Sequence, residues 1–116
     1  MWLHYHKHEQ NYLNQLNRLL EKFHYDYCYG LEELLYHIQE FPVSSQENLL
    51  FYLGGVLNHN LYWMGMSTKR KGPQGKLKIQ LEKTFGSYDG FWKIFKEKAL
   101  QMKGSGYTFL VLNRDG

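Results

Sequence analysis

The sequence has little of what marks several large classes of protein. Its 116 residues include a single cysteine, Cys28, which excludes an internal disulfide framework and fits a reducing compartment. No apolar run approaches the roughly 18 residues of a membrane-spanning helix. The opening MWLHYHKHEQ turns polar too early for the apolar middle of a signal peptide. We therefore expect a soluble protein with no membrane partner, located in the cytoplasm.

Aromatic side chains are abundant by contrast, and the charges are unevenly distributed. Ten Tyr, seven Phe and three Trp make up 17% of the chain, enough to build a sizeable core in one short domain. Residues 1–68 carry three basic and seven acidic side chains, whereas residues 69–116 carry eleven and four. A basic half is typical of proteins that bind nucleic acid, an anionic surface or a small anionic substrate. Lysines on a solvated helix face explain the excess of positive charge more simply. The basic run at 69–71 is short and no nucleic-acid motif accompanies it, so we expect no nucleic-acid partner.

Hydrophobic periodicity predicts a mainly α chain that begins as a long antiparallel helical hairpin. We expect helices over 2–23, 31–38, 76–85 and 88–103, together with a long helix from a Ser44–Glu47 capping box to about Met66. Ser87 is expected to cap the last helix. The predicted domains are a hairpin over 1–66, a linker over 67–75 and the beginning of an α/β domain over 76–116.

The segment YTFLVLN at 107–113 is β-branched and aromatic, and is predicted to be the first strand of that α/β domain. It runs into Asp115-Gly116, a strong hairpin-turn signal. A hairpin turn should be followed by a partner strand, and none follows here. We therefore expect the chain to be a truncated part of something longer.

Two of the predicted helices each carry three residues spaced four apart, and therefore on one face. These are His4, His8 and Tyr12 on the first helix, and Gly55, His59 and Trp63 on the second. An antiparallel pair of these helices would point imidazoles at each other, where helical bundles build metal sites. Imidazole binds several transition metals, so histidine alone does not select one. Aromatic core packing with hydrogen-bonded histidines would produce the same spacing.

Gly54 and Gly55 lie inside a predicted helix, where each glycine costs roughly 1 kcal/mol relative to alanine. The usual compensation is the close approach of another backbone or of a large side chain. Packing against bulky partners and the geometry of a site both explain the pair.

The histidines lie in two distinctive segments, LHYHKHEQNYLNQLN at 3–17 and LGGVLNHNLYW at 53–63. These segments resemble the first and second helices of the iron/manganese superoxide dismutases. GPQGKL, KTFGSYDGFWKIF and KGSGYTFLVLN resemble later motifs of the family in the same order. The resemblance covers essentially the whole chain.

The resemblance implies an oxidoreductase that converts superoxide to oxygen and hydrogen peroxide by cycling a metal between M(III) and M(II). It implies manganese or iron as cofactor, superoxide as a small anionic substrate, and a homo-oligomer, expected to be a dimer. His4 and His59 match metal ligands of the family, and Tyr12 and His8 match the catalytic pair at the substrate entrance.

The resemblance also implies a pocket around the metal, lined by Gly55, Trp63 and Tyr107. The family usually has Trp where Tyr107 stands. Iron-type members often carry glutamine at the position of Gly55, so glycine there slightly favours manganese.

The family's other two ligands, an Asp and a His in a D-V-W-E-H-A-Y stretch, have no counterpart in this sequence. The chain therefore supplies two of four protein ligands, and we expect it to be inactive in isolation. The alternative is a degenerate, non-catalytic relative that serves as a helical scaffold or interaction module.

Overall fold

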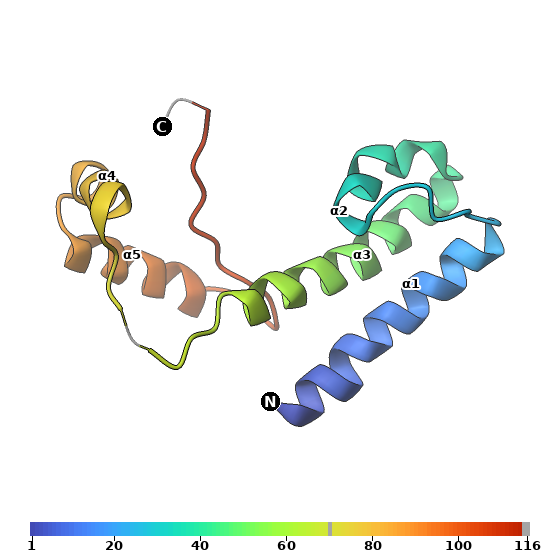
Figure 1. The fold of residues 1–116 in the computed structure, drawn as a ribbon, viewed down its shortest axis with the longest axis horizontal. Coiled ribbons are helices and arrows are strands. Elements are labelled where there is room, and N and C mark those ends of the chain that lie inside the picture. The colour runs from blue at the N-terminus through green and yellow to red at the C-terminus, as the bar shows by residue number, and fades with distance from the viewer. Residues whose placement is uncertain (70, 115–116) are drawn as a thin grey trace. The chain divides into compact units, whose positions relative to one another are not determined.

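The computed structural model describes residues 1–69 and 71–114 (Figure 1). Arg70 of the predicted linker and basic run, and the Asp115-Gly116 turn signal, lie outside the described residues. The chain forms two compact units, Met1–Met66 and Ser67–Gly116, and each is described by itself.

The first unit is a helical hairpin with a short arm at its closed end (Figure 1). The π-helix η1 (His4–Glu9) continues directly into α1 (Gln10–Lys22). The arm consists of α2 (Leu31–Leu34) and the 3-10 helix η2 (Leu35–Glu40). The long helix α3 (Val43–Met64) then returns antiparallel along α1. The helices predicted over 2–23 and 31–38 are thus present, each in two hydrogen-bonding forms.

The start of α3 differs from the prediction. Pro42 is its N-terminal cap residue and Ser44 lies inside the first turn, so the Ser44–Glu47 capping box does not form. The proline ring holds φ at −53°, close to the helical value, and the Ser45 N–H donates to the Pro42 carbonyl at 2.8 Å. The backbone of Pro42 therefore begins the helix without a side-chain cap.

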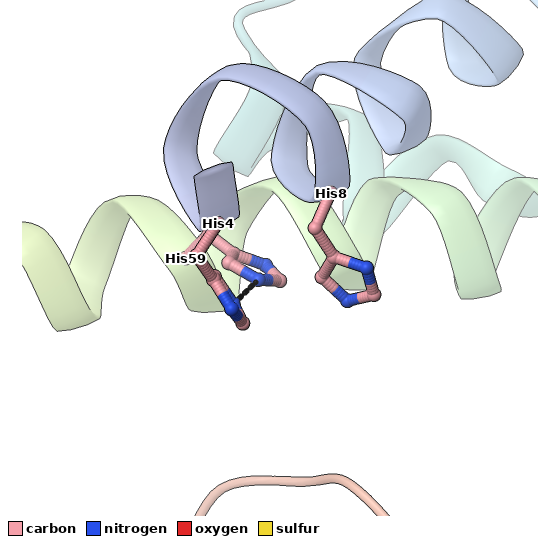
Figure 2. Close-up of side chains that lie close together, drawn as sticks. All are labelled: His4, His8 and His59. Atoms are coloured by element: carbon pink, nitrogen blue, oxygen red, sulfur yellow. Dashed lines mark hydrogen bonds between the residues drawn. The ribbon is translucent and has the colours of Figure 1, made fainter. Parts of the chain in front are cut away.

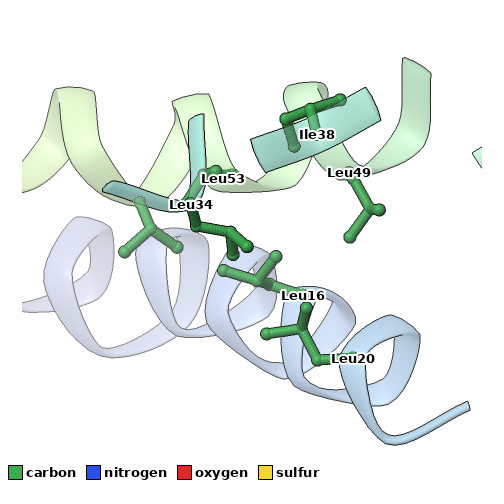
Figure 3. Packing of buried hydrophobic residues seen from close by; sticks show 7 residues of the cluster. Leu16, Leu20, Leu34, Ile38, Leu49 and Leu53 are labelled. Atoms are coloured by element: carbon green, nitrogen blue, oxygen red, sulfur yellow. The ribbon is translucent and has the colours of Figure 1, made fainter. Parts of the chain in front are cut away.

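The core of the first unit lies where α1, α3 and the α2–η2 arm converge (Figure 3). Its buried members are aliphatic: Leu16, Leu20, Leu34, Ile38, Leu49, Leu53 and Val56. Each such side chain contributes about 1.5–3 kcal/mol through removal of its apolar surface from water. This cluster holds α3 in register against α1.

The second unit contains two helices, α4 (Gly75–Phe85) and α5 (Tyr88–Leu100), close to the predicted bounds. Gly86, with φ of 80°, ends α4 in a conformation that favours glycine. Ser87 caps α5 as predicted, because its Oγ accepts from the Gly90 N–H at 2.9 Å. Leu81 and Phe91 are the buried hydrophobic side chains among the residues of this unit that the structure describes.

The prediction of a mainly α fold is confirmed, but the strand predicted over 107–113 does not form. A strand exists only when its backbone pairs with a neighbouring strand, and residues 1–69 and 71–114 contain no second strand. The β-branched and aromatic composition therefore gives an extended segment instead. Within the described residues, every helix is too short or too polar to span a membrane.

Candidate metal centre

Three imidazoles meet at the open end of the helical hairpin (Figure 2). His4 and His8 come from η1, and His59 comes from α3. The Nε2 atoms of His4 and His59 are 2.9 Å apart, although 55 positions separate the two residues in the sequence. One nitrogen from each of the three rings lies within 4.8 Å of the other two. The antiparallel packing of α1 on α3 thus brings together the two faces that the sequence spacing predicts.

The helix that carries His4 and His8 is a π-helix, whereas the sequence predicts an α-helix. Its i→i+5 hydrogen bonds are rare in proteins and are frequent at functional sites. The rings of His4 and His8 still lie on one side of the helix, with centroids 4.8 Å apart. His6, between them, is turned away and stacks on Trp2 with centroids 4.7 Å apart.

His59 is the buried member of the cluster, with 3% of its surface exposed. Its Nδ1 lies 2.6 Å from the Gly55 carbonyl oxygen, which can only accept, so Nδ1 carries the proton. In the neutral ring Nε2 is then an acceptor, and it accepts the hydrogen bond that His4 Nε2–H donates. The Gly55 carbonyl therefore orients His59 with its lone pair toward His4.

The electrostatics around His4 favour the neutral form of its ring. Partial desolvation of the ring lowers the pKa of His4 below its ordinary value, and repulsion from protonated His59 and His8 lowers it further. Neutral imidazole is the form that binds a metal ion.

Tyr12 packs directly on Gly55, and this contact explains one glycine of the pair. A Cβ added to Gly55 would come closer than 3.0 Å to three atoms of the Tyr12 ring, whereas a Cβ added to Gly54 would meet nothing within 4 Å. The Tyr12 ring also contacts two of the imidazoles, with centroid separations of 5.2 Å to His8 and 5.6 Å to His59. At Gly55 the close packing and the geometry of the site are therefore explained by the same contact with Tyr12. Neither explains why residue 54 is a glycine.

A buried carboxylate, Glu9, holds Trp63 beside the histidines. The Trp63 indole N–H donates to Glu9 Oε2 at 2.5 Å, and Glu9 is 8% exposed. The Trp63 ring meets His4 edge-on, with centroids 6.0 Å apart. Sequence reasoning missed Glu9. Its only signal is that it follows His8 directly and is the first acidic residue of the chain.

The remaining predicted residue and the remaining histidines lie elsewhere. Tyr107 belongs to the second unit, where it stacks on Phe109, so its place in a metal pocket stays a prediction. His37 stacks on Tyr29 with centroids 3.7 Å apart and pairs with Glu40 at 2.6 Å. His24 lies in the loop after α1 with φ of 52°.

The donor set fits a transition-metal ion. His59 is a buried ring held by a backbone carbonyl, whereas His4 and His8 are exposed rings that can adjust. The carbonyl contact of His59 is the usual support for a metal-binding histidine, whose second nitrogen donates to a carbonyl or carboxylate.

Comparison with known proteins gives a consistent result over the whole chain. The family model described as "Iron/manganese superoxide dismutases, alpha-hairpin domain" matches residues 1–67, and the corresponding "C-terminal domain" model matches residues 73–116. A Streptococcus acidominimus protein named superoxide dismutase [Mn/Fe] is 36% identical over 116 residues, which cover 100% of this chain and 79% of that protein. Superoxide dismutase [Mn] of Escherichia coli K12 is 37% identical over 117 residues, covering 99% of this chain and 55% of that protein. Superoxide dismutase [Mn] of Yersinia enterocolitica is 34% identical over 116 residues, and 56% of its length is covered.

Proposed function

The chain belongs to the iron/manganese superoxide dismutase family, and on that premise we propose that residues 1–66 supply half of the metal centre of such an enzyme. The chain spans about half the length of the Escherichia coli and Yersinia enterocolitica relatives, so dismutation is proposed for the assembled protein. The observation that supports the proposal most directly is the 2.9 Å approach of His4 Nε2 to His59 Nε2 across the helical hairpin.

His4 and His59 would hold the metal, and manganese or iron would supply the redox chemistry that converts superoxide to oxygen and hydrogen peroxide. Of these two metals we favour manganese. The Tyr12 ring covers Gly55 and leaves no space for the glutamine that iron-type members often carry at that position.

Tyr12 and His8 would handle protons at this site. Forming hydrogen peroxide from superoxide consumes protons. The rings of Tyr12 and His8, two residues with proton-bearing side chains, lie beside the His4–His59 pair. The Glu9–Trp63 hydrogen bond would fix the indole as one wall of the pocket. Tyr107 would form a further wall in the assembled protein.

Superoxide is an anion, and the lysine-rich second unit would raise its local concentration. The apolar side chains exposed on α4 and α5 support association into a homo-oligomer, which we propose to be a dimer. A cytoplasmic location is proposed as well, supported by the single, exposed Cys28.

The second candidate is a non-catalytic scaffold that keeps the family fold. It is favoured by the aliphatic core of the hairpin, which packs α1, α3 and the α2–η2 arm together without a metal ion. The two functions differ in their need for the histidines, because a scaffold gains nothing from the approach of His4 to His59.

Manganese content and superoxide turnover of the purified chain test the proposal. After dialysis against a chelator we expect little retained manganese and little turnover, because two imidazoles leave the ion mostly coordinated by water. Adding a polypeptide with the second half of the Escherichia coli relative should raise turnover with the native chain, and should fail with His59→Gln. Equal turnover with native and H59Q chains would favour the scaffold. Tightly held manganese with rapid turnover in the chain alone would refute the proposed half-site.

A further inference from the structure

The histidine cluster holds one more imidazole than the pair to which metal binding is assigned above. We propose that His8 is a third direct ligand in this chain. His4, His8 and His59 would then form a three-nitrogen site for a borderline divalent ion, Cu²⁺ or Zn²⁺, rather than for Mn²⁺. The inference rests on the proposed function for the His4–His59 pair and concerns the isolated chain, whose cluster holds no carboxylate among the described residues. Manganese and the proton-handling role of His8 are proposed for the assembled protein.

The three rings form a nearly regular triangle (Figure 2). Their centroids are 4.8 Å apart for His4 and His8, 5.0 Å for His4 and His59, and 5.4 Å for His8 and His59. Zinc–nitrogen bonds of about 2.0–2.1 Å in a tetrahedral site place two ligand nitrogens about 3.3 Å apart. The 2.9 Å separation of His4 and His59 is already near that value, and the His8 nitrogen is within 4.8 Å.

The burial pattern of the three side chains suits the small adjustment that this geometry requires. His59 is buried and held by the Gly55 carbonyl, so it acts as the fixed ligand. His4 and His8 are exposed on η1 and can turn toward it without disturbing the aliphatic core. The ion would take the place of the proton that His4 and His59 share in the metal-free protein.

The donor chemistry decides which ion is preferred. The cluster consists of three imidazoles, and no carboxylate belongs to it among the described residues. Mn²⁺ favours oxygen ligands and binds nitrogen sites weakly, whereas affinity rises through the first-row metals to Cu²⁺, with Zn²⁺ above Mn²⁺. Three histidines with one open position are also a known ligand set of zinc. Both arguments place Cu²⁺ and Zn²⁺ ahead of Mn²⁺.

The competing explanation is that His8 only packs against Tyr12, whose ring it meets edge-on. His8→Phe separates the two, because phenylalanine keeps the aromatic contact and removes both nitrogens. His6→Phe is the matched control: His6 lies on the same π-helix, outside the cluster, and stacks on Trp2.

The test is titration of the full chain with Cu²⁺ and with Zn²⁺ against a competing chelator, together with electron paramagnetic resonance of the Cu²⁺-loaded protein. We expect one Cu²⁺ per chain, hyperfine coupling to three nitrogens, and an affinity for Mn²⁺ far below that for Zn²⁺. H6F should match the native chain. H8F should bind Cu²⁺ at least about tenfold more weakly and show coupling to two nitrogens.

Coupling to only two nitrogens in the native chain would overturn the proposal without any variant, so a folding defect in H8F cannot obscure the answer. Unchanged Cu²⁺ affinity in H8F, with loss of binding in His59→Gln, would overturn the third ligand and leave the His4–His59 pair standing. Unchanged binding in both H59Q and His4→Gln would overturn the proposed function as well.

Discussion

The two units of the chain differ in how many apolar side chains they bury. The first unit buries a cluster of seven aliphatic residues between its helices. In the second unit Leu81 and Phe91 are buried among the described residues, while many large apolar side chains are exposed. These include Leu77, Ile79, Trp92, Ile94 and Leu100. The first unit therefore holds the larger aliphatic core, although it too exposes large apolar side chains, Trp2, Phe51 and Leu61 among them.

The units also divide the chemistry. All six histidines lie within residues 1–66, and the lysine-rich sequence lies after residue 68. A metal site needs ligands held within a fraction of an ångström, and Leu49, Leu53 and Val56 anchor α3 in the core over the turns that precede His59. Attraction of an anion needs only the sum of distant charges. On the proposed function, the precise task therefore falls on the first unit and the diffuse task on the second.

Truncation of a core leucine should show the largest difference between the units. Leu53 is 0% exposed between α1 and α3, so Leu53→Ala should lower the free energy of unfolding by about 2–5 kcal/mol. Leu77, 52% exposed on α4, is the matched position, and L77A should change it by less than about 0.5 kcal/mol. Urea denaturation followed by far-UV circular dichroism measures both. Similar losses in the two variants would mean that Leu77 is packed as closely as Leu53, which would contradict its exposure.

The two adjacent glycines of α3 give a sharper comparison within the first unit. Gly55→Ala forces a methyl group into the Tyr12 ring and should cost about 1–3 kcal/mol. Gly54→Ala meets open space and should stabilise the protein by about 1 kcal/mol through helix propensity. Denaturant midpoints of the two variants should therefore move in opposite directions. A shift in the same direction would show that Tyr12 does not rest on Gly55.

Substitution of the serines at the starts of α3 and α5 should have the smallest effect on stability. The effect should be larger at α5, in the second unit. Ser87→Ala removes the side-chain cap of α5 and should cost about 1 kcal/mol. Ser44→Ala should cost less than about 0.5 kcal/mol, because Ser44 is exposed inside α3 and Pro42 begins the helix. Thermal unfolding of the two variants distinguishes them. A larger loss of stability in S44A than in S87A would show that the Ser44–Glu47 capping box forms, in contradiction to the structure.

Much of the fold could be predicted because its signals are local. Leucines at spacings of three and four mark α1, and Gly86 and Ser87 mark the junction of α4 and α5. The π-helix escaped prediction because histidines four apart share a side in either kind of helix. The strand over 107–113 failed because a strand depends on a partner that local composition does not reveal.

The site was predictable as far as spacing defines a helix face. Positions 4 and 59 could be placed opposite each other once two antiparallel helices were expected. Glu9 could not be found this way, because its role depends on the indole of Trp63, 54 positions further along the chain. The different roles of Gly54 and Gly55 likewise depend on which one faces Tyr12, a tertiary contact.

Paramagnetic broadening by Mn²⁺ tests most directly whether the packed unit carries the half-site. Substoichiometric Mn²⁺ is added to the ¹⁵N-labelled chain, and the loss of amide signals is mapped along the sequence. Broadening should be confined to residues around His4, His8, Tyr12, Gly55 and His59, should vanish on addition of chelator, and should be abolished in His59→Gln. Broadening that begins elsewhere, at the acidic pair Glu32–Glu33 or in the second unit, and that persists in H59Q, would contradict the assignment.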